Sequence, residues 1–442
     1  MGAADERGRE QGLGVSALVS IGIGGMVGGG IFSVLGLTVQ VAGAGAYVSF
    51  LVGGTVAALT GVSYALLSVR LPSRGGTAAF LDRAFGTRVA GPLNLLLWLS
   101  YFVMLGLYAV AFGTYLAALL GLPGGWHRPL ASIVVVAFAG LNLAGARVVG
   151  RAESVLVYFK LAVLLVFCLG GLVFVDPARV SPAAYPHGGA IVYAGCLIFL
   201  GYEGFELIAN AAEDAADPAR TLPRAYLISI GSVIALYVLV AFVAVGNLTA
   251  QQIAQDRDYA LAVAARPLLG QAGFSLIAIA AVVSTASAIN ATLYGTAKFT
   301  YLMARHGELP EHLAEPVWNR PIGGLIATTL GTLVVVNLVD IQGISLMGSA
   351  GFLIVFAAVN LAAAKLPGLR PAARAASRCG VVACAGCLAA LLSYAAANIP
   401  KQLAVLFGML ATAVIAEAVI RSRGRTLPRT ASHRVPDRPG RP

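Results

Sequence analysis

Long uninterrupted apolar runs, separated by short polar stretches, recur along nearly the whole chain. A helix needs roughly 20 apolar residues to cross a bilayer, and about twelve runs reach that length. The runs are continuous, whereas a membrane β-barrel needs short alternating strands. The chain is therefore predicted to be an all-α integral membrane protein with spans near 14–36, 43–69, 91–121, 130–146, 153–175, 189–212, 225–246, 271–300, 322–339, 343–365, 380–397 and 402–420.

Composition and charge placement agree with this pattern. The chain is 58% hydrophobic and 11% charged, whereas soluble proteins carry roughly 25% charged residues. The net charge of +11 could suggest a nucleic-acid partner, but most of the 30 Lys and Arg residues fall in alternate loops and in the C-terminal tail. This positive-inside distribution predicts a plasma or inner membrane protein with both termini cytoplasmic and no nucleic-acid partner. The basic positions include Arg70, Arg74, Arg83, Arg88, Arg147, Arg151, Lys365, Arg370, Arg374 and Arg378.

Glycine interrupts the first apolar run. Seven of the fifteen residues in Gly22–Gly36 are glycine, although each glycine inside a helix costs roughly 1 kcal/mol relative to alanine. Pairs such as Gly24 and Gly28 can form a helix-packing stripe, or the helix can be unwound here to bind a ligand. The sixth run has a similar interruption at Gly201–Gly204, and this second break favours an unwound site.

Interruptions five spans apart are typical of transporters built from inverted repeats. We therefore expect one transmembrane domain, 1–420, with a first repeat at about 14–175 and a second at about 189–365. Two helices would be appended at about 380–420, and the basic segment 421–442 is predicted to be a disordered cytoplasmic tail.

Broken helices at membrane depth expose backbone groups that suit a zwitterion. Irregular backbone survives there only if it lines a cavity or is buried in protein. The N–H groups that begin the second half-helix suit a carboxylate, and the carbonyls that end the first half suit an ammonium. Glycine lets the ligand approach the backbone closely.

Three stretches resemble the amino acid–polyamine–organocation (APC) superfamily of amino acid permeases. They are GGGIF at 28–32, FLGYEGFELIANAAEDAADPARTLPRA at 199–225 and STASAINATLYGTAKFTYLMARHGELP at 284–310. The resemblance implies a fold of about twelve helices, with a 5+5 inverted repeat, broken helices 1 and 6 and two appended helices. It also implies alternating access and amino acid transport by proton symport or exchange, with no cofactor and no metal.

The resemblance also implies a substrate site at the breaks. The N–H groups of Gly28, Gly29 and Gly30 would hold the substrate carboxylate, and Gly29 stands where many members have serine. Many relatives carry a gating aromatic near position 200, for which Phe199 and Tyr202 are the alternatives here. The remaining substrate-site candidates, largely for the ammonium, are Ile23, Met26, Phe199, Leu200, Tyr202 and Glu203.

Lys160 lies inside the fifth predicted span. Its amine can snorkel to the interface or lie buried, where it could gain and lose a proton during transport. In proton-coupled members of the superfamily, a lysine in this helix occupies the place that sodium fills in other relatives. We therefore expect proton coupling through Lys160, with the hydroxyl groups of Ser284, Thr285 and Ser287 nearby.

Other polar and aromatic residues have expected structural or gating roles. Glu206 is expected to anchor the sixth helix, and Glu203 to meet a substrate ammonium or relay a proton. The loop 247–270 has apolar residues at helical spacing and is a candidate lid. Glu213 and Arg220 are expected to join an inner-gate network with Asp214, Asp217 and Arg224, and pocket candidates among the aromatics are Trp98, Tyr101, Tyr108 and Tyr294.

These features predict proton-coupled uptake of neutral amino acids, with a small-molecule substrate, protons and the lipid bilayer as partners. An exchanger of amino acids, amines or polyamines with the same fold is the first alternative. A channel or non-transporting membrane sensor is an alternative of a different class. No Ser/His/Asp grouping suggests an enzyme. The sequence leaves the substrate side chain and the oligomeric state open.

Overall fold

The computed structural model describes residues 12–73, 75–144, 150–305, 309 and 322–422. The predictions for Arg74, Arg147 and the tail beyond 422 lie outside this part. Within it the chain is almost entirely helical, and the only strand-like pairing among these residues is an isolated bridge between Leu13 and Ala215. The all-α prediction is confirmed.

Each predicted span corresponds to helical structure. Ten described segments are long and apolar enough to cross a membrane, one of which runs from Gly30 through a bend to Arg70, and two further apolar helices are shorter. The long helices follow the predicted order: α4 (Ala46–Arg70), α6 (Thr87–Leu119), α7 (His127–Ala144), α8 (Gly150–Gly171), α11 (Pro218–Asn247), α14 (Arg266–Arg305), α15 (Ile322–Leu338), α16 (Ile341–Ala364), α17 (Pro371–Asn398) and α18 (Pro400–Ser422).

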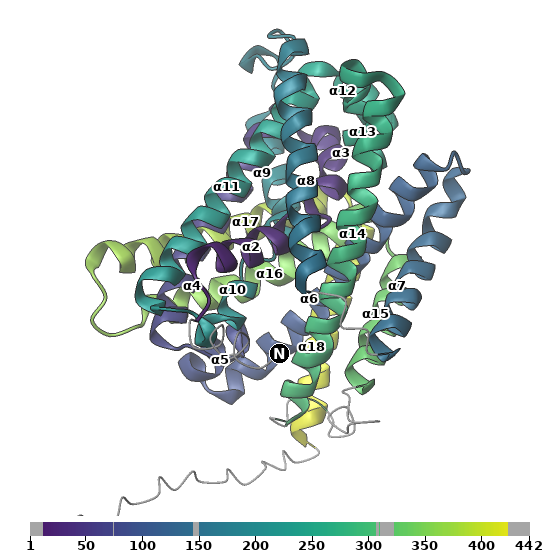
Figure 1. Ribbon diagram of the computed structural model, residues 1–442. Coiled ribbons are helices and arrows are strands. Elements are labelled where there is room, and N and C mark those ends of the chain that lie inside the picture. Colours follow the sequence, from purple (N-terminus) through teal and green to yellow (C-terminus); the bar gives the residue numbers. More distant parts are fainter. Residues whose placement is uncertain (1–11, 74, 145–149, 306–308, 310–321, 423–442) are drawn as a thin grey trace, which may run out of the picture.

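The first and sixth spans are broken. The first consists of α2 (Val15–Met26) and α3 (Gly30–Ala42), with a turn between them. The sixth consists of α9 (Gly188–Leu197), the 3-10 helix η5 (Ile198–Tyr202) and the single turn α10 (Leu207–Asn210). Figure 1 shows these short helices near the middle of the molecule, among the long helices.

Apolar side chains divide between the core and the outer surface. In α8, Val155 and Leu169 are each 65% exposed, as expected for residues that face lipid. In α3, by contrast, every residue from Gly30 to Val39 is buried. Because α3 is enclosed by protein, its irregular N-terminal end avoids contact with lipid, which could not satisfy its backbone groups.

The candidate lid forms three short helices instead of one. They are α12 (Ala250–Gln255), η7 (Arg257–Tyr259) and α13 (Ala260–Ala264). Its apolar residues Ile253 and Leu261 are fully buried, and Arg257 donates a hydrogen bond to Gln40 at the end of α3, with 3.2 Å between Nη1 and Oε1. The lid therefore packs on α3 at the end of the molecule opposite the start of α2 (Figure 1).

Candidate functional site

The two broken helices cross at two pairs of glycines. A Cβ atom on Gly25 would lie 2.7 Å from the carbonyl oxygen of Gly204, and one on Gly30 would lie 2.5 Å from that of Gly201. Gly204 also has φ +121°, a conformation that residues with side chains rarely adopt. The glycines therefore allow close backbone packing, and they do so at the breaks themselves.

Side chains from three surrounding helices hold the carbonyl groups around the first break. Tyr237 of α11 donates its hydroxyl hydrogen bond to the Met26 carbonyl at 2.8 Å, and its hydroxyl also meets the backbone of Ile31 in α3. Tyr237 therefore joins the two halves of the broken helix. In α14, the Ser284 hydroxyl donates to the Val27 carbonyl at 3.0 Å and is also in contact with the Gly28 carbonyl.

The third of these surrounding helices is α8, which contributes Lys160. Its side chain is 2% exposed, and its Nζ donates to the carbonyl oxygen of Gly24 at 3.1 Å. The amine therefore points into the protein toward the end of α2. Snorkelling, the alternative reading of the sequence, is not the arrangement seen here.

The N–H groups at the first break lack the hydrogen-bond partners that its carbonyl groups have. In the described part of the chain, the N–H groups of Gly28 and Gly29 have no hydrogen-bond acceptor. Gly29 is the N-cap of α3 and offers no capping side chain, and the first turn of α3 holds no acidic residue. Unpaired N–H groups at the start of a helix form a natural anion site.

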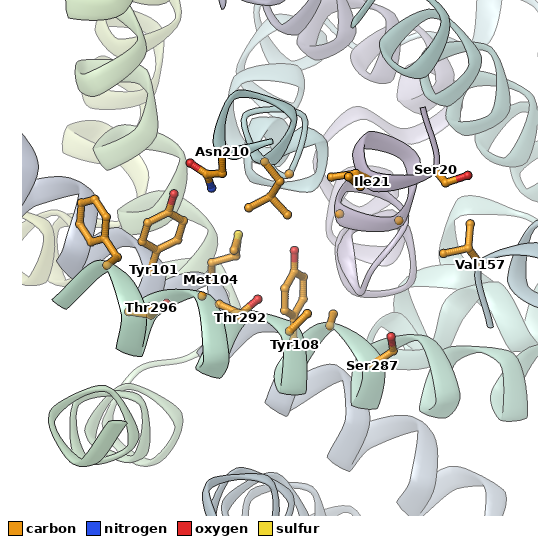
Figure 2. Close-up of a pocket in the computed structure, with 18 of the residues that line it drawn as sticks. Ser20, Ile21, Tyr101, Met104, Tyr108, Val157, Asn210, Ser287, Thr292 and Thr296 are labelled. Carbon is orange, nitrogen blue, oxygen red and sulfur yellow. The ribbon is translucent and has the colours of Figure 1, made fainter. Parts of the chain in front are cut away.

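A cavity of about 730 Å³ leads from the start of α2 to the breaks. Among the residues that the structure describes, none that lines this cavity is Asp, Glu, Lys, Arg or His. Figure 2 shows side chains of α2, α6 and α14 facing this space, with the Tyr108 hydroxyl pointing into it. The lining includes Ser16, Ser20, Ile21, Gly24, Gly25, Thr77, Tyr101, Met104, Tyr108, Val157, Gly204, Leu207, Asn210, Ser287, Thr292 and Thr296.

Two glutamates lie behind the second break. Glu203 and Glu206 are each 1% exposed, and their carboxyl groups lie close enough to interact. The Gly204 N–H donates to Oε2 of Glu206 at 2.8 Å, which is the type of contact expected of an anchor for the broken helix. Neither residue is among those that line the cavity.

Sequence comparison identifies the family. The family model for amino acid permeases matches residues 13–419. The chain belongs to this family, within the APC superfamily.

Several relatives cover most of this permease. The uncharacterized protein MJ0609 of Methanocaldococcus jannaschii is 37% identical over 78% of this chain and 80% of its own length. The inner membrane transport protein YbaT of Escherichia coli is 34% identical over 80% of this chain and 83% of its own length. The branched-chain amino acid permease BcaP of Bacillus subtilis is 27% identical over 74% of this chain and 76% of its own length. Together with the apolar helices, these matches identify a multi-pass membrane transport protein.

The permease brings together some of the predicted substrate residues and buries others. Gly28, Gly29 and Gly30 lie together at the break, but none is among the residues that line the cavity. The carbonyl of Ile23 accepts from the Val27 N–H at 2.8 Å, so this group and the Met26 carbonyl already have partners within the protein.

The candidate gating residues are also enclosed. Phe199, Leu200 and Tyr202 are at most 1% exposed. The Tyr202 hydroxyl donates to the Phe50 carbonyl at 2.8 Å, and the Leu200 N–H donates to Ser349 at 3.0 Å. In this conformation the predicted gate region is part of the core.

The remaining predicted residues are dispersed. Thr285 donates to carbonyls of its own helix, at Ala281 and Val282, whereas Ser287 lines the cavity. Arg220 pairs with Asp217 at 3.6 Å, with both side chains more than half exposed, so this pair contributes little on its own. Glu213 is exposed in the segment before α11.

The role of Tyr237 in the permease was not predicted from its sequence. A tyrosine inside an apolar run is a weak signal, because most are packing residues. Among the aromatic candidates, Tyr101 and Tyr108 line the cavity. Tyr294 is 66% exposed, and Trp98 donates to Thr300 at 2.7 Å.

Proposed function

We propose that this permease is a secondary active transporter that takes up neutral amino acids together with protons. The observation that carries the proposal is a cavity whose described lining residues include no Asp, Glu, Lys, Arg or His, and which ends beside a broken helix with unpaired N–H groups. The substrate carboxylate would bind these N–H groups, and an uncharged side chain would occupy the cavity. The name of the relative BcaP, a branched-chain amino acid permease, agrees with a neutral substrate.

The arrangement of open and covered ends supports alternating access. The lid α12–η7–α13 packs on α3 at one end, whereas the cavity reaches the start of α2 at the other. With the basic loops and both termini in the cytoplasm, this is an inward-facing conformation in the plasma or inner membrane. Glu213 and Arg220, in the loop before α11 and at its start, would belong to the gate on that side.

Lys160 is the proposed site of proton coupling. As an ammonium, it donates to the Gly24 carbonyl and brings a positive charge to the break, close to Ser284 and its backbone partners. A sodium ion at the same carbonyls would be repelled by this charge. Loss of the proton would weaken the contact between α8 and α2, and so would couple protonation to movement of the broken helix. Glu203 and Glu206 form a second candidate relay.

The test is uptake into proteoliposomes. An imposed proton gradient, with the interior alkaline, should drive saturable accumulation of a labelled neutral amino acid without sodium. Lys160→Ala should remove the dependence on the gradient, whereas Lys298→Ala, which changes an exposed lysine of α14, serves as the matched control. A requirement for sodium, or equal gradient dependence in Lys160→Ala and wild type, contradicts proton coupling through this residue.

The same vesicles separate the alternatives. An exchanger would need internal substrate and ignore the proton gradient. A channel or sensor would show no saturable accumulation against a concentration gradient.

A further inference from the structure

Basic side chains gather where α4 ends and where the chain turns from α16 into α17. This basic corner consists of Arg70, Lys365, Arg370, Arg374 and Arg378. Arg374 and Arg378 lie one turn apart on one face of α17, and Arg370 directly precedes its first turn. Arg374 is half-buried, and the other four are exposed.

Two contacts bring the segments of the basic corner together. Nη1 of Arg70 donates a hydrogen bond to the Pro367 carbonyl oxygen, in the loop between α16 and α17, at 2.9 Å. Nζ of Lys365 lies 4.8 Å from the centre of the ring of Phe85, the last residue of α5 (Gly76–Phe85). Because the start of α5 lines the cavity, the basic corner lies at the end of the molecule where the cavity opens.

The helices that carry the basic corner supply no counter-charge. No Asp or Glu occurs in α4, α16, α17 or the loop 365–370, and the neighbouring α5 carries one charge of each sign, Asp82 and Arg83. Within the residues that the structure describes, no carboxylate pairs with any of the five basic side chains. Cations near the N-terminus of a helix are also unfavourable for the helix, so the stability of α17 does not explain its arginines.

The cations lie where the lipid-facing surface reaches the headgroups. Residues 379–397 of α17 carry no charge, which matches the roughly 20 residues that cross the hydrocarbon core. The arginines therefore lie just outside this core. One turn further into the core, the neighbouring side chains are apolar and face outward: Val382, after Arg378, is 72% exposed, and Leu361, before Lys365, is 40% exposed.

We propose that the basic corner binds an anionic phospholipid of the leaflet on the side where the cavity opens. The phosphate would lie among Lys365 and the arginines of α17, and the acyl chains would lie along the exposed apolar faces of α16 and α17. Arginine suits this role because its planar guanidinium can donate two hydrogen bonds to one phosphate. Lipid is favoured over a nucleic acid or an acidic protein, because neither of these would use the lipid-facing side chains next to the cations.

The experiment measures retention of radiolabelled dioleoylphosphatidylglycerol by the purified full-length protein in detergent, and its displacement by unlabelled competitors. Each Lys or Arg near an anionic membrane surface corresponds to about a fivefold gain in affinity. Wild type should therefore prefer dioleoylphosphatidylglycerol to zwitterionic dioleoylphosphatidylcholine by about tenfold or more. The triple variant R370Q/R374Q/R378Q should lose most of this preference, whereas R370K/R374K/R378K, which keeps the charge, should retain most of it.

The matched control is R224Q/K298Q/R305Q, which removes three exposed cations from the start of α11 and the last turns of α14 and should keep the preference. Equal binding of the two lipids by wild type would overturn the proposal, as would an equal loss in the two Gln variants or no loss in either.

Two measurements on wild type need no variant. Added salt should weaken binding of the anionic lipid, because salt screens exposed charges, and a preference that salt leaves unchanged would contradict the proposal. Glycerol 1-phosphate carries the phosphate without acyl chains. If it displaces the labelled lipid as well as unlabelled dioleoylphosphatidylglycerol does, the basic corner is a site for soluble phosphate esters and the lipid proposal is wrong.

Discussion

Because the two broken helices cross at Gly204, the stability of the protein should be sensitive to a side chain at this position. In Gly204→Ala, the new Cβ would lie 2.4 Å from the carbonyl carbon of Gly25 and 2.6 Å from the N atom of Met26. Both are backbone atoms, so no side chain can rotate away. The φ of +121° adds strain of about 1–3 kcal/mol, and overpacking adds about 1–3 kcal/mol. The total destabilisation should be about 2–6 kcal/mol.

Thermal unfolding of the purified protein in detergent measures this effect, and Gly231→Ala supplies the control. Gly231 is an exposed residue of α11, and a Cβ there would meet nothing within 4 Å. Alanine is favoured over glycine in a helix by roughly 1 kcal/mol, so Gly231→Ala should raise the melting temperature slightly. Gly204→Ala should lower it by several degrees. Equal melting temperatures for the two variants would refute the close backbone crossing.

Three further outcomes are expected. Tyr237→Phe should destabilise the protein by about 1–3 kcal/mol in thermal unfolding, because the buried Met26 carbonyl loses its hydroxyl donor; unchanged melting would contradict this role. Gly36→Val should loosen the packing of the lid on α3, because a Cβ on Gly36 would lie 1.9 Å from the Arg257 carbonyl oxygen. A cysteine introduced on the face of α3 under the lid should then react faster with a membrane-impermeant thiol reagent, and unchanged labelling would contradict this packing. Asn210→Asp adds a carboxylate to a cavity whose described lining residues are uncharged, and it should shift competition toward cationic amino acids; an unchanged substrate profile would place the substrate side chain elsewhere.

Much of the fold could be predicted from the sequence, because the length of an apolar run is a local property. The predicted spans correspond in order to helical structure, and the interruptions near Gly28 and Gly201 fall where the first and sixth helices break. The candidate lid was found from its periodicity, but its division into three short helices was not. The turns near Asp256 and Ala265 depend on how the segment fits over α3 and α14, which periodicity does not encode.

The candidate site could be predicted only in part. The sequence located the break at Gly28–Gly30, but it did not show that the carbonyls of Ile23 and Met26 have partners within the protein. It also did not show that Phe199 and Leu200 face the core. Each outcome depends on the rotation of one helix against another, and apolar residues surround the whole circumference of these spans.

By itself, the sequence determined that the protein is a helical membrane permease, that two of its helices are broken and that glycine occupies both breaks. Hydrophobic run length and glycine conformational preference are properties of the chain alone. Only the tertiary structure decided that Gly25 packs on Gly204, that Lys160 points inward to Gly24 and that Arg70 binds the loop between α16 and α17. These contacts join residues far apart in the sequence, and close packing of the helices determines which of them meet.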